Sequence, residues 1–263
     1  MHKIGVIVRK EWSEVFKNRL VLGTVGFMPL MLTALPLVLL RVMGTGGGLG
    51  EAGTTDMPAS FARLCEGLTG IECAQYFFVT EFLLLYMMMP LMIPVTIAAY
   101  SIVGEKSTRT LEPLLATPIT TVELLAAKSL AAAIPAIVAT WACFIIFIVA
   151  APFVGAKPVV VASIFSPVWL VAVFVAGPLM AIMAVNFAVI VSSRVNDPRV
   201  AEQMAAVIIV PLLGMLFGQL AGVIVLNVQF MLVAVSIILI VDVGLIYLGA
   251  RLFQRETILT KWK

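Results

Sequence analysis

The sequence predicts an all-α membrane protein with six transmembrane helices, in which residues 1–263 form a single transmembrane domain. The first observation is composition: 62% of the residues are apolar and only 12% are charged. The mean hydropathy is +1.13. A soluble domain has roughly 45–50% apolar and about 25% charged residues, so this chain has too few polar groups to cover a water-facing surface. The other two observations are six long apolar runs and an uneven distribution of Lys and Arg.

Each apolar run is long enough to cross the hydrocarbon core, which takes about 20 helical residues. A helix is suited to this because it satisfies its own backbone polar groups. The predicted spans are residues 20–40, 76–103, 129–153, 168–192, 204–226 and 231–250. The second run is the longest, so we expect tilt or a break near Pro90 and Pro94.

Lys and Arg lie mostly on one side of these spans. Fourteen of the seventeen fall in the N-terminal segment, the loops after spans two and four, and the C-terminal tail. The opposite side has Arg41, Arg63 and Lys157. By the positive-inside rule, both termini are cytoplasmic and residues 41–75 form an outer loop. We therefore expect a multi-pass protein of the cytoplasmic (inner) membrane.

Residues 1–19 have the pattern of an amphipathic helix. Ile4, Val8, Trp12, Val15 and Phe16 recur at a spacing of three to four, with charged residues between them. This favours a helix lying in the inner headgroup plane. The alternative is that the segment only extends the first span into the cytoplasm.

The loop after span two is the most polar cytoplasmic stretch between spans. It leads into a predicted capping box at Thr120 and Glu123, with Ile119 and Leu124 placed as a hydrophobic staple. Residues 110–116 have room for a short helix with an apolar face. Such a helix suits docking onto a cytoplasmic partner, whereas the alternative is a plain connecting loop folded against the bundle.

Composition argues against several chemistries. The single histidine, His2, excludes a bis-histidine haem, an H-E-x-x-H zinc site and a Ser-His-Asp triad, and we expect neither a metal nor a catalytic site. Residues 48–53 match G-x-G-x-x-G, but they lie in the outer loop without a βαβ context, and the chain has no Walker A sequence. No feature points to nucleic acid as a partner.

Two acids fall within the predicted spans, where charge is costly. Asp242 is interpreted either as a cation, proton or substrate site, or as a buried acid bonded to a neighbour such as Asn186, Tyr247 or Ser236. Glu81 lies near the outer end of span two, where its carboxylate is expected to reach water.

Cysteines and glycines leave two further alternatives. Cys65 and Cys73 in the outer loop form either a disulfide or two ordinary thiols, whereas Cys143 is expected to be a packing residue. Gly214, Gly218 and Gly222 permit either close helix packing or a break of span five into a re-entrant pair.

Three blocks of the sequence together resemble the ABC-2 family of ABC-transporter permeases. The loop block reads GEKSTRTLEPLLATPITTVELLAAKSLA and is similar to the family's coupling-helix signature. The N-terminal block reads VRKEWSEVFKNRLVL and includes the family's Lys10-Glu11 pair. The third block, between spans four and five, reads SSRVNDPRVAEQMAAVIIVPLL.

The resemblance implies a permease subunit of an ABC exporter that works as a homodimer or heterodimer. It implies a coupling helix at residues 105–117 that rests on a separate ATP-binding-cassette ATPase. ATP and Mg²⁺ would bind that partner, and no cofactor is expected in this chain. The implied ATPase contacts are Glu105, Arg109, Thr110, Leu111, Glu112, Leu114 and Leu115. The implied secondary cytoplasmic contacts are Arg194, Asp197, Arg199 and Glu202.

Other transport and enzyme classes remain as alternatives. We expect the substrate to be a small apolar or amphipathic compound. An ion-coupled secondary transporter or channel using Asp242 would call for paired intramembrane charges or an inverted repeat, which the sequence does not show. An intramembrane lipid enzyme would need clustered Asp, Glu or His at a membrane face, and Asp197 and Asp242 have no such companions.

Overall fold

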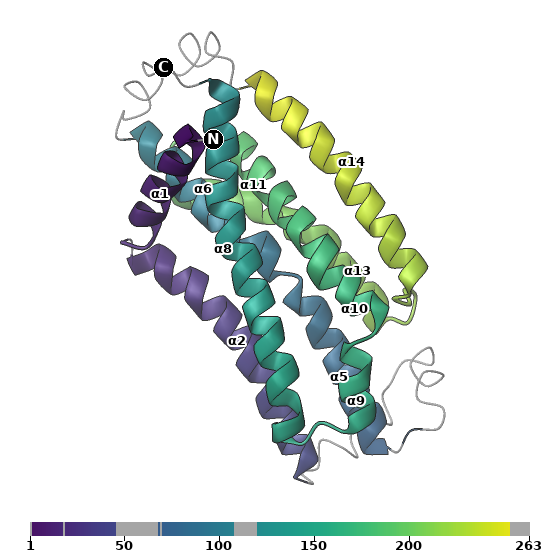
Figure 1. Ribbon diagram of the computed structural model, residues 1–263. Helices are drawn as coiled ribbons and strands as arrows, with labels where there is room; N and C mark the ends of the chain where they lie inside the picture. The colour runs from purple at the N-terminus through teal and green to yellow at the C-terminus, as the bar shows by residue number, and fades with distance from the viewer. Residues whose placement is uncertain (1, 18, 46–67, 69, 108–119, 253–263) are drawn as a thin grey trace.

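The computed structural model describes all residues except 1, 18, 46–67, 69, 108–119 and 253–263, and it shows an elongated helical bundle (Figure 1). Every secondary-structure element in the described residues is a helix. Six described segments are long and apolar enough to cross a membrane, and each overlaps one predicted span. They are Val21–Gly44, Gly70–Glu105, Glu123–Val154, Pro158–Arg194, Pro198–Leu220 and Val228–Gly249. The predicted all-α membrane fold is therefore confirmed.

The first and last helices that the structure describes bring the N-terminal and C-terminal parts of the chain to the same end of the bundle. Helix α1 (His2–Val15) precedes α2 (Arg19–Gly44), and α14 (Val228–Leu252) comes last. Figure 1 shows α1 and the C-terminal end of α14 at the same end of the bundle, which we call the α1 end. Residues 16–17 form a turn, so α1 is a separate helix and not an extension of the first span.

The second span occupies the centre of the bundle and is broken as expected. It consists of α5 (Gly70–Tyr86) and α6 (Met89–Ser107), which are separated by a turn at Met87 and Met88. Pro90 and Pro94 follow this turn, and proline lacks the N–H that a continuous helix needs. α6 packs against α8, α11 and α12, so displacement of α6 would reach most of the bundle.

The third span is α8 (Thr121–Ala150), and it begins with the predicted capping box. The Glu123 N–H donates to Thr120 Oγ1 at 3.2 Å, and the Thr120 N–H donates to Glu123 Oε2 at 2.8 Å. Each side chain satisfies a backbone donor that has no partner inside the helix, which fixes where α8 starts. Ile119, the other residue of the predicted staple with Leu124, lies outside the described residues.

A buried amide holds the connection at the far end of α8. The connection consists of η1 (Ala151–Val154) and α9 (Pro158–Ile164). Gln75 of α5 donates to the Gly155 carbonyl at 3.1 Å and accepts from the Lys157 N–H at 2.9 Å. Gly155 adopts a φ of 100°, which favours glycine.

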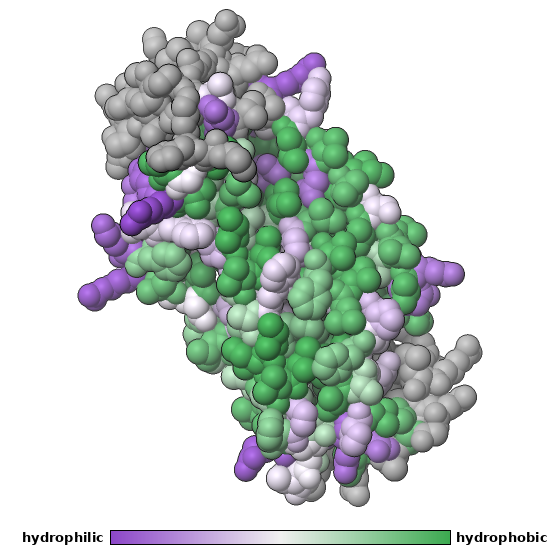
Figure 2. All heavy atoms as spheres, viewed as in Figure 1, coloured by the Kyte–Doolittle hydropathy of each residue, from purple (hydrophilic) through white to green (hydrophobic). Residues whose placement is uncertain are grey.

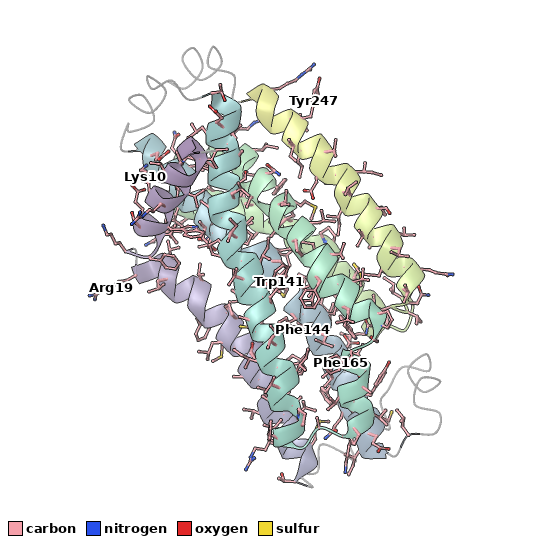
Figure 3. All side chains as sticks on the ribbon, viewed as in Figure 1. Lys10, Arg19, Trp141, Phe144, Phe165 and Tyr247 are labelled. Atoms are coloured by element: carbon pink, nitrogen blue, oxygen red, sulfur yellow. The ribbon has the colours of Figure 1, made fainter. Side chains whose placement is uncertain are left out.

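The fourth span contains a π-helical stretch at its middle. It consists of α10 (Pro167–Val171), η2 (Ala172–Ala176) and α11 (Gly177–Arg194). Trp141 Nε1 of α8 donates to the Val173 carbonyl at 3.1 Å, and π-turns leave carbonyls free for such donors. Trp141 and Phe144, in the middle part of α8 (Figure 3), both pack their rings against Phe174.

The fifth span is helical throughout Pro198–Leu220. It consists of α12 (Pro198–Ala205), η3 (Ala206–Ile209) and α13 (Val210–Leu220). Residues 221–227 then form a turn and a short non-helical link to α14, not a re-entrant helical pair. Gly222 has a φ of 73°, and its N–H donates to the Gln219 carbonyl at 2.9 Å.

The surface is apolar over the middle of the bundle. Figure 2 shows hydrophobic residues over the middle of the visible face and hydrophilic residues mostly toward its two ends. α14 exposes large apolar side chains along its length, including Ile237, Ile240 and Val243. Such a continuous apolar surface is what lipid contact requires.

Candidate functional site

Helix α1 is fastened to the start of α8 by apolar packing and one hydrogen bond. Ile7 is buried against Leu124 and Ala127 of α8. Trp12 Nε1 donates to the Ala131 carbonyl of α8 at 2.9 Å. Of the apolar residues predicted for this helix, Phe16 lies after its end and is exposed. The buried face of α1 instead includes the charged Glu11.

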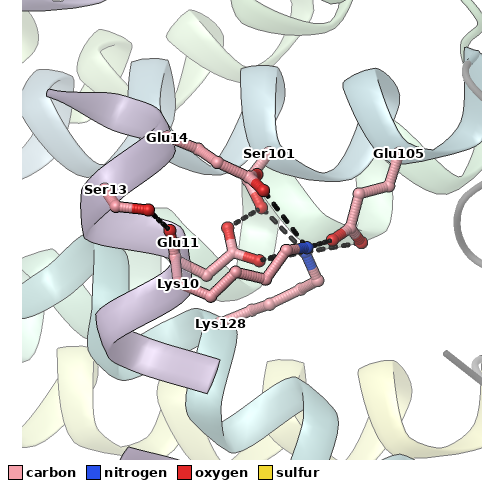
Figure 4. Close-up of polar contacts among 7 residues, drawn as sticks. All are labelled: Lys10, Glu11, Ser13, Glu14, Ser101, Glu105 and Lys128. Carbon is pink, nitrogen blue, oxygen red and sulfur yellow. Dashed lines mark hydrogen bonds and ion pairs between the residues drawn. The ribbon is translucent and has the colours of Figure 1, made fainter. Parts of the chain in front are cut away.

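Six polar residues from three helices meet beside this contact, and we call them the α1 cluster (Figure 4). They are Lys10, Glu11 and Glu14 of α1, Ser101 and Glu105 of α6, and Lys128 of α8. The carboxylates of Glu11, Glu14 and Glu105 have oxygens within 4.8 Å of one another. The ammonium groups of Lys10 and Lys128 supply the positive charge between these carboxylates.

Lys128 occupies the centre of the α1 cluster. Its Nζ lies 2.9 Å from Glu11 Oε1 and 2.7 Å from Glu105 Oε2, and it donates to Ser101 Oγ at 2.8 Å. Ser101 also donates to Glu11 Oε2. The side chains of Lys128 and Glu105 are each only 6% exposed. Removing one member of such a group would leave a buried charge without compensation, so the three helices are joined strongly at this point.

Lys10 closes the outer side of the α1 cluster. Its Nζ lies 2.7 Å from Glu105 Oε1 and 3.5 Å from Glu14 Oε1. Partial burial lowers the pKa of Lys10. The hydrogen bond and charge of Glu105, together with the charges of Glu11 and Glu14, outweigh burial and raise that pKa above its ordinary value. Lys10 therefore stays charged throughout the neutral range.

Two members of the α1 cluster come from the helices on either side of residues 108–119, which make up most of the predicted coupling helix. Glu105 is on the last turn of α6, which ends at Ser107, and Lys128 is two turns into α8. The carboxylate of Glu105 faces Lys10 and Lys128 of its own chain. The other predicted ATPase contacts lie outside the described residues: Arg109, Thr110, Leu111, Glu112, Leu114 and Leu115.

The predicted secondary contacts lie around the start of α12. Asp197 is the N-cap of that helix and accepts hydrogen bonds from the N–H groups of Arg199 and Val200 at 2.7 and 3.3 Å. Glu202 accepts from Thr96 Oγ1 of α6 at 2.6 Å. Arg194 and Arg199 are exposed. Asp197 and Glu202 thus have structural partners here, and the two arginines face outward.

The structure does not join Asp242 to the neighbours considered for it. Asp242 is 5% exposed, and neither of its carboxylate oxygens has a hydrogen-bond partner among the described residues. Asn186 Nδ2 donates to the Ile182 carbonyl, and Ser236 Oγ donates to the Leu232 carbonyl. The ring of Tyr247 lies under the Arg251 guanidinium, 4.7 Å from ring centroid to Cζ.

The remaining sequence expectations have mixed outcomes. Glu81 was expected to reach water, but it is buried. Cys73 is disulfide-bonded and Cys143 is free. Cys65 lies outside the described residues, so its pairing with Cys73 stays a prediction.

Sequence reasoning missed Lys128 and Ser101 as members of the site. The available signal was a single basic residue in the alanine-rich stretch LLAAKSLAAA, near the start of an apolar span. A charge at that place on a helix usually has a partner. The partners of Lys128 are 117 and 23 positions away along the chain, so only the folded structure identifies them.

Comparison with known proteins agrees with the fold and with the sequence blocks. The profile of the ABC-2 family transporter proteins matches residues 6–234, which cover all six apolar spans at least in part. A comparison with curated proteins gives no significant match. The matched region includes the α1 cluster and both flanks of the predicted coupling helix. The chain belongs to the ABC-2 family of transporter proteins and is a multi-pass membrane permease of the ABC-transporter type.

Proposed function

We propose that this chain is the permease subunit of an ATP-driven exporter that works as a dimer and rests on a separate ABC ATPase. The α1 cluster is the observation that carries the proposal. It joins the two helices that flank residues 108–119 to each other and to α1 through buried ion pairs. ATP and Mg²⁺ bind the partner, and this chain supplies the membrane path.

Coupling requires that a displacement of the segment between α6 and α8 is transmitted to the transmembrane helices as one rigid unit. Breaking a buried ion pair costs about 3–5 kcal/mol. The Lys128 contacts therefore keep α1, α6 and α8 together when the segment between α6 and α8 is displaced. α6 then transmits the movement to α11 and α12, against which it packs.

The sidedness in this proposal follows from charge. The α1 end carries most of the Lys and Arg residues, so it faces the cytoplasm, where the ATPase is found. The proposed transported compound is small and apolar or amphipathic, and spans composed mainly of Val, Ala, Leu and Ile are compatible with such a compound. It enters from the cytoplasm or the inner leaflet.

The test is purification of the tagged full-length protein from its native membrane in mild detergent, followed by mass spectrometry of the proteins that accompany it. We expect a Walker-containing ATPase in near-equal amount. Leu114→Glu in the predicted coupling helix should lower its recovery. Lys157→Glu, at the opposite end of the bundle, is the control and should not.

Purification of the protein alone, without ATP hydrolysis, would contradict the proposal. Asp242 would then be the first place to examine, because its carboxylate has no partner among the described residues. An ion-coupled transporter is the function that such a buried acid would favour.

A further inference from the structure

Two buried polar side chains face each other within the membrane-spanning part of the bundle, outside the α1 cluster. Glu81 of α5 is 7% exposed and Gln219 of α13 is 2% exposed. α5 and α13 are in contact, and the Gln219 side chain is the polar group that faces the Glu81 carboxyl. The mechanism proposed above uses neither residue.

The pair presents acceptor oxygens that lack donors. Among the residues that the structure describes, Glu81 Oε1, Glu81 Oε2 and Gln219 Oε1 have no hydrogen-bond partner within normal geometry. More than nine in ten buried polar groups in proteins have such a partner. The Gln219 side-chain NH2 group is the donor that lies toward Glu81, but it does not reach hydrogen-bond geometry with either carboxyl oxygen. The three oxygens can therefore be satisfied by a donor from outside the chain, and without one the Glu81 carboxyl is expected to carry a proton.

The helices that form the pair carry no positive charge. α5 reads GIECAQYFFVTEFLLLY and α13 reads VPLLGMLFGQL, and neither contains Lys, Arg or His. A carboxylate held in an apolar interior costs several kcal/mol unless a cation or a donor compensates it. Three and four positions from Glu81, on the same face of α5, are the apolar residues Phe77, Phe78, Leu84 and Leu85.

Gln219 is held in place by a tight turn at the end of α13. The N–H groups of Val223 and Ile224 both donate to the Gly218 carbonyl, at 2.9 and 3.0 Å. A Cβ at Gly218 would lie 2.5 Å from Ile224 Cδ1, so only glycine fits without displacing that side chain. The amide of Gln219 is therefore presented to Glu81 from a fixed backbone.

The same turn is close to the outer surface of the bundle. Phe217 and Leu220, on either side of Gln219 along the helix, are exposed, and so is Val223 in the turn. An amphiphilic molecule in the bilayer could thus reach the pair past the short end of α13. Its apolar part would stay among the exposed apolar side chains.

We propose that Glu81 and Gln219 form a binding site for the ammonium group of a primary-amine amphiphile. A protonated amine supplies N–H donors for the two Glu81 oxygens and Gln219 Oε1, and its positive charge compensates the Glu81 carboxylate. This proposal rests on the transport function proposed above and narrows its substrate to cationic amphiphiles. An amine lipid headgroup has the same chemistry and is distinguished by the test.

The test uses the purified full-length permease in phosphatidylcholine nanodiscs, without its ATPase. Dicyclohexylcarbodiimide modifies protonated carboxyl groups in apolar surroundings, and peptide mass spectrometry reports the labelling of Glu81. Dodecylamine is the probe, and dodecan-1-ol is the neutral control of equal chain length. We expect dodecylamine at about ten times its Kd to lower the labelling of Glu81 about tenfold. Dodecan-1-ol should leave the labelling unchanged.

Variants separate the site from other buried acids. Gln219→Leu should keep the labelling of Glu81 but weaken protection by the amine, because it removes one acceptor. Asp242→Asn removes a second buried acid whose oxygens have no hydrogen-bond partner among the described residues, and it should leave protection unchanged. Dodecyltrimethylammonium, which has the charge without an N–H donor, should protect less than dodecylamine.

Three results would overturn the proposal: no labelling of Glu81, no protection by dodecylamine, or equal protection by dodecan-1-ol. Protection by phosphatidylethanolamine in the disc, without added amine, would keep the ammonium site and assign it to a lipid headgroup. Because the ATPase is absent from this experiment, a negative result would leave the coupling function intact. Failure of the ATPase to co-purify would in turn leave the protection result standing.

Discussion

Lys128 Nζ lies 2.7 Å from Glu105 Oε2, although the two residues are 23 positions apart in the sequence and are separated by residues 108–119. Both side chains are almost fully buried. The pair therefore ties the end of α6 to the first turns of α8, the two helices that flank residues 108–119 in the sequence. Because Lys128 also contacts Glu11, the same ammonium group holds α1 in place.

Replacing Lys128 with Met should strongly destabilise the α1 end of the bundle. The substitution leaves the carboxylates of Glu11 and Glu105 buried without their cation, at a cost of about 3–5 kcal/mol. Thermal unfolding of the protein in nanodiscs should show a lower midpoint. Lys17→Met, at an exposed residue in the turn after α1, is the matched control and should change the unfolding midpoint little.

The double variant Lys128→Met with Glu105→Gln should recover part of the lost stability. Neutralising Glu105 removes one of the two carboxylate charges that Lys128→Met leaves uncompensated, while that of Glu11 remains, and residues in direct contact show non-additive effects. If the stability lost in the double variant equals the sum of the losses in the two single variants, the ion pair is contradicted.

The contacts of Lys10 should matter for stability only below alkaline pH. Its folded-state pKa is raised above the ordinary value of 10.5. The stabilisation of the folded state by the charged Lys10 side chain is therefore complete below about pH 10.5, and it is lost as the pH rises through the folded pKa. Arginine keeps its charge at this pH, so the unfolding midpoint of Lys10→Arg should fall less above pH 10.5 than that of the wild type. Identical profiles would show that Lys10 contributes nothing.

Replacing Trp12 with Phe should loosen α1 without unfolding the bundle. The variant keeps an aromatic ring but loses the hydrogen bond to the Ala131 carbonyl. Loss of about 1 kcal/mol corresponds to about fivefold faster amide exchange in α1. Hydrogen exchange measured by mass spectrometry should change in His2–Val15 and not in α14. Unchanged exchange in α1 would mean that this bond does not hold the helix.

Replacing Glu112 with Arg should uncouple transport while the protein stays inserted in the membrane. Glu112 lies outside the described residues, and its role follows from the resemblance of its sequence block to the coupling signature. ATPase stimulation and transport are measured together in proteoliposomes that contain both subunits. Normal values for both in this variant would refute the coupling assignment.

Replacing Asp242 with Asn should leave folding and transport unchanged. The carboxylate is buried and its oxygens have no hydrogen-bond partner among the described residues. A neutral side chain of the same size removes the cost of burying a charge. The yield of folded protein and the transport rate are the measurements. Lost transport with normal folding would support an ion-coupled mechanism at this residue.

The sequence predicted the features that depend on neighbouring residues. Spans are set by the length and polarity of continuous runs, so all six were recognised, and the break just before Pro90 follows from the missing N–H of proline. The capping box at Thr120 and Glu123 is a contact over three positions and was predicted correctly. The amphipathic character of α1 was also evident from its periodicity.

Only the tertiary structure decided which charges meet and which are left unpaired. Glu11, Glu105 and Lys128 lie on three helices, and their contact depends on how those helices are rotated and packed. Glu81 was placed at the water interface from its position in the sequence, but the packing of α13 against α5 buries it beside Gln219. Hydrophobicity determines which segments enter the membrane, whereas helix packing determines the partners of the few polar groups that enter with them.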